Sequence, residues 1–404
     1  MSLNPMPIET WDVVVVGGGP SGATAANELA KLGHKVLLLD RDGRTKPCGG
    51  AIPPRAIRDY QIPDDMLVAK ITSARMVSPS DRNVDIPIDN GYVGMVDREA
   101  FDEWLRVRAA TNGAERRIGT FEELTRDADG TALIHYRPGH AAKGGVTLSL
   151  RARSVIGADG AKSLVARQTV RGADRMKFVF AYHEIVRAPK AQPALDYDAR
   201  RCDVIYRGAL SPDFYSWIFP HGDTVSIGTG SAHKGFSMRT SIGELRAKTG
   251  LDGCETLRRE GAPIPMKPLK RWDNGRDVVL AGDAAGVVAP ASGEGIYYAM
   301  LGGELAAQAV HQLLITGDVR SLKLARKRFM RDHGFVFFIL GIMQRFWYST
   351  EKRRESFVKI CLDKDVQKLT FESYMNKKLA RKKPMAHVRI FFKDLAHLVG
   401  FARA

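Results

Sequence analysis

The stretch Val13-Val14-Val15-Val16-Gly17-Gly18-Gly19-Pro20-Ser21-Gly22 decides how the chain begins to fold. The four valines predict a buried strand, and the glycines predict a tight turn into an alanine-rich helix over 21–31. Gly17 permits the sharp turn, Gly19 removes a side chain where a diphosphate must approach, and Gly22 allows close packing of the helix. The free N–H groups at the start of that helix would face the phosphates.

An acidic residue ends the next apolar run. Residues 36–39 predict a second strand, and Asp40, 18 positions after Gly22, can accept hydrogen bonds from ribose hydroxyls. Arg41 follows as a further candidate contact. An ordinary glycine turn needs neither the flanking strands nor the acid, so the pattern predicts a dinucleotide-binding strand–turn–helix–strand unit.

Two later motifs favour FAD over a nicotinamide as the bound dinucleotide. Residues 155–160 and 278–285 each predict a strand that ends at a carboxylate, Asp159 and Asp283 respectively. FAD is long and needs support far along the sequence, whereas a simple nicotinamide dehydrogenase needs neither motif. The loop before the next helix supplies further candidate cofactor contacts, namely Gly286, Pro290, Gly293, Gly295 and Ile296.

Composition limits the other possibilities. The 404 residues, 44% of them hydrophobic, can bury a large core. The cysteines show no ligand-like spacing, so we expect neither disulfides nor a metal site, and a reducing cytoplasm fits best. The sequence has neither a signal peptide nor an uncharged run of roughly 18 to 20 apolar residues, so any membrane contact is expected to be peripheral.

The net charge of +16 is unevenly distributed. From residue 319 onward, 21 Lys and Arg face 7 Asp and Glu, a balance of +14, which leaves about +2 for the first 318 residues. Basic residues beside the aromatic stretch 335–348, and the cluster Arg381-Lys382-Lys383, suit an anionic membrane surface. A solvated basic face on a packed helical pair is the alternative. No nucleic-acid motif accompanies the charge, so we expect no nucleic acid partner.

Several segments carry a family resemblance: Lys46-Pro47-Cys48-Gly49-Gly50-Ala51-Ile52-Pro53-Pro54, Val96-Asp97-Arg98, Asp159-Gly160, Ser211-Pro212-Asp213-Phe214-Tyr215-Ser216-Trp217-Ile218-Phe219-Pro220 and Gly282-Asp283-Ala284-Ala285-Gly286. From about residue 12 onward the chain resembles the geranylgeranyl reductases of (bacterio)chlorophyll biosynthesis, which are FAD enzymes of the aromatic-hydroxylase fold. The resemblance implies that Arg98 and Asp283 contact FAD. It also implies that Cys48, with Gly49 and Gly50, lies in a loop facing the flavin.

The same resemblance implies an activity. Isolated double bonds of a geranylgeranyl group, carried by bacteriochlorophyll or by a diphosphate, would be saturated with electrons from NADPH through FAD. A plain alkene accepts hydride only if a proton arrives before or with it, and Cys48 is the candidate donor. A thiol with an ordinary pKa near about 8.5 is a weak acid, however, and a packing role in the turn remains open.

The segment 214–219 is dense in aromatic residues, as expected for a strand that lines a long apolar substrate tunnel. Tyr215 and Trp217 would border the substrate, and Phe219 and Pro220 would close the site. An aromatic strand that only builds core is the alternative. His221 is expected to be a hydrogen-bonded structural residue.

These motifs predict an α/β protein with a Rossmann-like FAD-binding domain, an inserted and mainly antiparallel substrate sheet, and a helical C-terminal region. We expect the FAD-binding domain over 7–72, 96–175 and 270–312. The substrate domain would comprise 73–95 and 176–269, and the basic helical region 313–404.

Rival functions remain at this stage. A flavin monooxygenase would use the same cofactor motifs, a related reductase would act on another isoprenoid lipid, and a non-catalytic flavoprotein would only present its basic tail. NADH or ferredoxin remains an alternative to NADPH. The expected location is the cytoplasm or, by peripheral contact, the inner face of photosynthetic membranes. The head group, the number and order of reduced bonds and the oligomeric state stay open.

Overall fold

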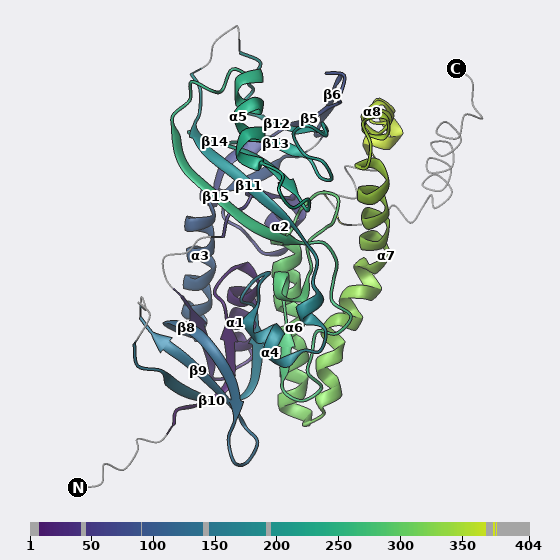
Figure 1. The fold of residues 1–404 in the computed structure, drawn as a ribbon. Helices are drawn as coiled ribbons and strands as arrows, with labels where there is room; N and C mark the ends of the chain where they lie inside the picture. Colours follow the sequence, from purple (N-terminus) through teal and green to yellow (C-terminus); the bar gives the residue numbers. More distant parts are fainter. Residues whose placement is uncertain are drawn as a thin grey trace. The chain divides into compact units, whose positions relative to one another are not determined.

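The computed structural model describes residues 8–41, 46–89, 91–139, 145–190 and 195–368, together with Met375 and Lys377. The chain divides into two compact units, whose helices and strands are labelled in Figure 1. Unit 1 comprises residues 1–48, 98–179 and 262–341, and unit 2 comprises residues 49–97, 180–261 and 342–404.

Unit 1 contains a six-stranded sheet with a parallel centre. Strand β1 pairs in parallel with β2 on one side and with β10 on the other, and β10 also pairs in parallel with β16. Val13–Val16 are buried, as expected for a parallel strand covered on both faces. The strands of this sheet are β1 (Thr10–Val16), β2 (Val36–Asp40), β8 (Glu115–Arg126), β9 (Ala132–Pro138), β10 (Leu148–Gly157) and β16 (Val278–Leu280).

The predicted helix after the glycine turn is confirmed as α1 (Pro20–Lys31). Proline at its first position suits a helix start, where no backbone N–H is needed. Helix α1 packs against α3 (Arg98–Thr111) and lies beside α6 (Ile296–Thr316), as Figure 1 shows. The other helices that begin in this unit are α4 (Leu164–Thr169) and α7 (Lys323–Trp347), with the short 3₁₀ helices η2 (Ala173–Arg175), η3 (Gly282–Ala285) and η4 (Val319–Leu322).

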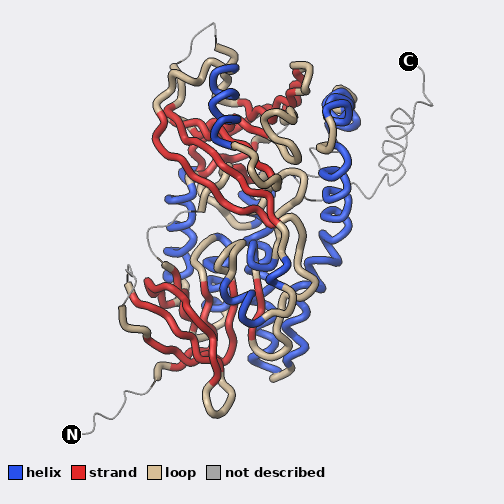
Figure 2. The backbone as a smooth tube through the Cα atoms, in the orientation of Figure 1, coloured by secondary structure: helices blue, strands red, loops and turns tan. Residues whose placement is uncertain are grey.

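Unit 2 contains a seven-stranded sheet in the order β15-β11-β14-β13-β12-β5-β6, drawn in red in Figure 2. Its strands are β5 (Ser73–Val77), β6 (Asn83–Pro87), β11 (Phe178–Arg187), β12 (Arg201–Ile205), β13 (Ser216–His221), β14 (Thr224–Ser231) and β15 (Thr256–Pro265). A smaller sheet and short helices complete the unit, namely β3 (Ala51–Ile52), β4 (Leu67–Ile71), β7 (Val93–Val96), α2 (Pro54–Asp59), η1 (Asp64–Met66), α5 (Met238–Lys248) and α8 (Glu351–Ile360).

The two faces of the large sheet differ in what they carry. Ile218 of β13 and Ile227 of β14 pack in one core cluster with Ile242 and Leu245 of α5. Because side chains alternate along a strand, Trp217 and its neighbours at every second position lie on the opposite face. One face is therefore an aliphatic core against α5, and the other is aromatic.

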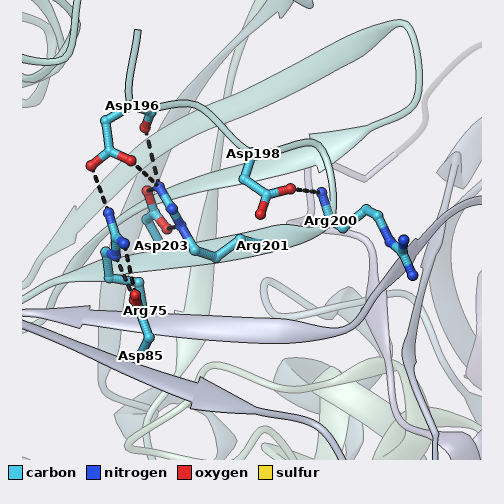
Figure 3. Close-up of polar contacts among 7 residues, drawn as sticks. All are labelled: Arg75, Asp85, Asp196, Asp198, Arg200, Arg201 and Asp203. Carbon is cyan, nitrogen blue, oxygen red and sulfur yellow. Dashed lines mark hydrogen bonds and ion pairs between the residues drawn. The ribbon is translucent and has the colours of Figure 1, made fainter. Parts of the chain in front are cut away.

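A charged network joins three strands at one side of this sheet (Figure 3). Arg75 of β5 binds Asp85 of β6 through Nε at 2.5 Å and Nη2 at 2.7 Å, and it binds Asp196 through Nη1 at 2.6 Å. Arg201 of β12 binds Asp203 at 2.7 Å and Asp196 at 3.1 Å. The network thus spans β12, β5 and β6, including the parallel pair β12–β5.

The compact units do not follow the predicted domain ranges everywhere. Residues 49–72, expected in the FAD-binding domain, group with unit 2, because β3 and β4 pair with β7 and Ile71 packs with Cys202. The described part of the C-terminal region is helical, as expected, but it is divided between the units at residue 341.

Candidate active site

The predicted cofactor motifs of unit 1 lie at the carboxyl ends of neighbouring parallel strands. The N–H of Gly17, after β1, bonds to Leu39 of β2 at 2.8 Å, and the N–H of Ala158, after β10, bonds to Val16 at 2.8 Å. The N–H of Ala281, after β16, bonds to Gly157 at 2.9 Å. This edge of an open α/β sheet is where dinucleotides bind. The fold therefore brings together motifs that are more than 250 residues apart, from Gly17 to Asp283.

The glycine turn has the shape that a diphosphate requires. Gly17 has a φ of 106°, and a Cβ on Gly22 would lie 1.8 Å from the carbonyl oxygen of Gly17, so no larger residue fits at either position. A Cβ on Gly19 would meet no atom within 4 Å. The turn is therefore closed where it meets its own backbone and open at Gly19, which fits an approaching phosphate.

Asp40 lies against this turn. Its carboxylate accepts a hydrogen bond from the N–H of Gly18, and Nη1 of Arg106 in α3 lies 3.8 Å away. Burial raises the pKa of Asp40, although the Gly18 hydrogen bond and the charge of Arg106 oppose the rise. Arg106 also donates to the carbonyl oxygen of Gly18 at 3.3 Å. Arg41, the next predicted contact, is exposed.

Arg98 forms a buried ion pair at the start of α3. Its Nε and Nη2 bind the carboxylate of Asp102 at 2.8 and 2.7 Å. Burial alone would lower the pKa of Arg98, but the charge and hydrogen bonds of Asp102, with a hydrogen bond to Cys48, raise it. Cys48 is thus held beside a guanidinium whose charge is shared with one carboxylate.

Asp159 has a structural task. Its carboxylate accepts hydrogen bonds from Ser163 Oγ at 2.5 Å and from the N–H groups of Leu164 and Val165 at 2.6 and 3.3 Å. These contacts cap the N-terminus of α4. Burial raises the pKa of Asp159, and the three hydrogen bonds oppose the rise. The carboxylate is therefore committed to the helix cap.

Asp283 sits at the start of η3 and is only 8% exposed. Its carboxylate forms an ion pair with Lys46. A Cβ on Gly295, the N-cap of α6, would lie 3.9 Å from Oδ1 of Asp283, so the acid and the helix start are neighbours. Gly295 itself has no side chain to cap α6, and Oε1 of the preceding Glu294 accepts a hydrogen bond from the N–H of Tyr297 at 3.0 Å.

The loop between η3 and α6 is shaped by its own backbone. Gly286 has a φ of 80°, and its N–H bonds to the carbonyl of Asp283 at 3.0 Å. Gly293, with a φ of 65°, donates to Ala289 at 2.8 Å. Pro290 is buried between them. The predicted loop residues therefore form one compact turn beside Asp283.

The aromatic face of the large sheet in unit 2 consists of Tyr215, Trp217 and Phe219. The ring centroid of Trp217 lies 6.0 Å from the ring centroid of Tyr215 and 6.1 Å from that of Phe219. Strand β13 begins at Ser216, so Tyr215 immediately precedes it. Pro220 alternates to the face opposite Trp217 and Phe219.

The loop glycines of unit 2 adjoin this strand. A Cβ on Gly49 would lie 3.2 Å from the ring of Phe219. Gly50 has a φ of 69°, and a Cβ there would lie 2.5 Å from Nε2 of His221. Nδ1 of His221 lies 2.9 Å from the carbonyl oxygen of Phe219, and burial lowers the pKa of His221. These contacts agree with the expected structural role of His221.

Sequence reasoning assigned no role in the site to Asp102, Arg106 or Lys46. The first carries a usable signal, because an acid four residues after Arg98 in a helix lies on the same side of that helix. The ion pairs of Arg106 with Asp40 and of Lys46 with Asp283 join distant segments, so they cannot be predicted from the spacing of residues within one segment.

Comparisons with known proteins agree with this geometry. The sequence model of the FAD binding domain family matches residues 10–179. The chain is 55% identical over 390 residues to a geranylgeranyl diphosphate reductase of Rhodobacter capsulatus, covering 96% of this chain and 98% of the relative. The chain belongs to the geranylgeranyl reductase family. A second family member, the geranylgeranyl diphosphate reductase of Synechocystis, is 36% identical, covering 96% of this chain and 97% of the relative.

A solved structure shares the fold of these reductases. The geranylgeranyl bacteriochlorophyll reductase-like protein of Thermoplasma acidophilum matches with a TM-score of 0.79 at 20% identity, covering 93% of this chain and 99% of that chain. The predicted fold class and the predicted FAD-dependent reductase are confirmed, and the monooxygenase alternative is not favoured. No described helix is long and apolar enough to cross a membrane.

Proposed function

We propose that this reductase saturates isolated carbon–carbon double bonds of a geranylgeranyl group, carried by bacteriochlorophyll or by a diphosphate, with electrons from NADPH. The observation that carries the proposal is the 55% identity, along nearly all of both chains, to the Rhodobacter capsulatus reductase. When bound, FAD supplies two-electron transfer to carbon, which no side chain can perform. The side chains bind, orient and protonate.

The cofactor contacts follow from the edge of the unit 1 sheet. We assign the diphosphate to the turn at Gly17, Gly19 and Gly22, and the ribose hydroxyls to Asp40. Arg106 holds the side chain of Asp40 in place. Asp159 supports cofactor binding indirectly, because it fixes the start of α4. Arg41, exposed just after β2, is assigned as a further cofactor contact.

The far end of the cofactor is assigned to the loop beside Asp283. Asp283 would accept hydrogen bonds from the ribityl chain, since Lys46 binds only its Oδ2 and a carboxylate accepts several hydrogen bonds. We assign the backbone N–H of Ile296, at the start of α6, to the pyrimidine edge. The compact turn supplied by Gly286, Pro290, Gly293 and Gly295 lets the backbone approach closely.

We assign Cys48 as the proton donor and Arg98 as the group that makes it competent. An alkene is a poor base, so the proton must leave a group whose conjugate anion is stabilised. When Sγ of Cys48 gives up its proton, the thiolate lies beside the guanidinium of Arg98. Asp102 keeps that guanidinium charged and oriented.

The aromatic face is assigned to the isoprenoid chain. Tyr215, Trp217 and Phe219 offer a broad apolar surface along which methyl-branched units can lie and from which water is excluded. Gly49, whose Cβ would lie 3.2 Å from the ring of Phe219, leaves room beside that ring. Pro220, on the other face, shapes the strand rather than the substrate surface.

The deciding experiment is anaerobic incubation of the purified protein with NADPH and geranylgeranylated bacteriochlorophyll or, separately, geranylgeranyl diphosphate. Mass analysis should show stepwise gain of paired hydrogens in the isoprenoid. Replacing Cys48 by Ala should lower turnover by about 10²- to 10⁴-fold while bound FAD is retained. Cys254→Ala, which removes a thiol of unit 2, is the control. Hydroxylated products that require oxygen, or full activity of Cys48→Ala, would contradict these assignments.

We also infer peripheral contact with an anionic membrane through α7. Phe335 and Phe338 are 65% and 61% exposed, which is unusual for large apolar side chains. Lys327, Arg331 and Arg345 are exposed at helical spacing from them and so share one side of the helix. Apolar rings flanked by cations suit the headgroup region of acidic lipids. The cluster Arg381-Lys382-Lys383 lies outside the described residues.

A further inference from the structure

The indole of Trp217 is fixed at two points by the neighbouring strand β14. Trp217 pairs directly with Gly228, and a Cβ on Gly228 would lie 2.0 Å from Cζ2 of the indole. The indole therefore lies against the backbone of β14 at Gly228. Only glycine, which has no Cβ, leaves room for the ring there. Its Nε1 donates a hydrogen bond to Oγ of Ser226 at 3.1 Å.

A buried histidine holds the serine in turn. His183 of β11 pairs with Gly228 from the other side, so His183, Gly228 and Trp217 form one row across three strands. Nδ1 of His183 lies 2.9 Å from Oγ of Ser226. His183 is 4% exposed, and Ser226 is fully buried. Neither side chain belongs to the aliphatic core against α5, since both point to the aromatic face.

The hydrogen-bond inventory explains why this arrangement sets one orientation. A serine hydroxyl has one hydrogen to donate. Because Oγ of Ser226 accepts the indole N–H, its own hydrogen can be donated to Nδ1 of His183. The imidazole then carries its hydrogen on Nε2, which lies 3.8 Å from Oε2 of Glu260. The hydrogen bonds Trp217–Ser226 and Ser226–His183 thus link the orientation of the indole to that of the imidazole.

We infer that Ser226 and His183 are positioning residues, which act on the substrate only through the orientation of Trp217. This inference rests on the proposed function, in which the aromatic face lines the isoprenoid chain. With Ser226 in place the indole presents its flat face along the sheet. Without the hydrogen bond, the ring can rotate about its side-chain bonds and change the width of the surface on which each double bond must lie.

The test is a double-mutant cycle between positions 226 and 217. Ser226→Ala should lower kcat/KM by about tenfold, and partly reduced isoprenoids should accumulate. The reason is that the isoprenoid chain must bind again in a shifted position before each further double bond is reduced. In a Trp217→Phe background the same substitution should have almost no further effect. Ser226→Thr, which keeps the hydroxyl, should restore most of the activity. Ser231→Ala is the matched control, because it removes a buried hydroxyl of the same strand that binds Asp213 instead.

His183 is tested in the same way. His183→Ala should resemble Ser226→Ala, whereas His183→Asn, which places a nitrogen or oxygen near the position of Nδ1, should rescue it. A second readout is independent of catalysis: NMR of protein labelled with ¹⁵N at its indole nitrogens should show faster exchange of the Trp217 Nε1 hydrogen in Ser226→Ala than in Ser231→Ala.

The outcomes separate the inference from the function on which it rests. An active wild-type enzyme whose Ser226→Ala and Trp217→Phe losses simply add overturns the inference alone, as does unchanged indole exchange. A wild-type protein that binds FAD but reduces no geranylgeranyl substrate overturns the proposed function, and the inference falls with it. Coupled losses together with faster indole exchange support both.

Discussion

Arg98 and Asp102 stand one turn apart in α3, and the guanidinium of Arg98 binds both oxygens of the Asp102 carboxylate, at 2.8 and 2.7 Å. The two residues are only 8% and 5% exposed. Two charges taken out of water stabilise a fold only while both are present, because either one alone is buried without compensation.

Replacing Asp102 by Asn should therefore destabilise the protein by about 3 to 5 kcal/mol. The measurement is the free energy of unfolding of flavin-free protein in urea. Glu103→Gln is the matched control, since the neighbouring Glu103 side chain is 47% exposed where it binds Arg106 and Arg116, and its loss should cost less than about 1 kcal/mol. Similar losses for the two variants would contradict the buried-pair argument.

The glycine turn allows binding to be separated from folding. Gly19→Ala should fold like the wild type, because its Cβ meets no atom within 4 Å, yet weaken FAD binding by roughly tenfold or more, which is about 1.4 kcal/mol. Gly22→Ala should fail to fold normally, since its Cβ would lie 1.8 Å from the carbonyl oxygen of Gly17. Flavin titration and urea unfolding distinguish the two effects. Gly91→Ala, also in open space, is the control. Undiminished FAD affinity of Gly19→Ala would contradict the assignment of the diphosphate to the glycine turn.

Asp40 predicts a specific pH dependence. Burial raises the pKa of Asp40 in the folded protein above its unfolded value, so folding is favoured while the group is protonated. That contribution is fully present below the unfolded pKa and is lost as the pH rises through the folded pKa. Flavin-free Asp40→Asn should hence be more stable than the wild type near neutral pH.

The stability difference between Asp40→Asn and the wild type should shrink as the pH falls toward about 4, near the ordinary pKa of aspartic acid. Urea unfolding at several pH values measures it. The same variant should bind FAD more weakly, because an amide is a poorer acceptor for ribose hydroxyls than a carboxylate. A difference that widens on acidification would show that the sign is wrong.

Membrane contact through α7 predicts lipid-dependent binding. Phe335→Asp and Phe338→Asp should each reduce sedimentation with vesicles that contain acidic lipids, and added salt should weaken wild-type binding because it screens the basic residues. Val146→Asp changes another apolar side chain, 75% exposed, and serves as the control. Equal binding of all variants, or no binding by the wild type, would rule out this surface.

Much of the candidate cofactor site could be described from the sequence because its signals are local. The valines before Gly17, the helix after it and Asp40 at the end of β2 follow from strand period, turn chemistry and capping within one short segment. The carboxylates at Asp159 and Asp283 follow from strand ends in the same way. The task of Asp159 could not be read locally, because the sequence pattern does not say whether a carboxylate faces a ligand or caps the next helix.

The sequence by itself determined which parts the reductase would contain: a glycine turn for a dinucleotide, an aromatic strand and a basic helical tail. Only the tertiary structure decided which side chains meet. Residues 49–72 group with unit 2, Arg106 reaches Asp40, and His183 and Ser226 orient Trp217 through strands far apart in sequence. Short-range patterns set local conformation, whereas pairing between distant strands depends on burial and register that emerge only when the whole sheet packs.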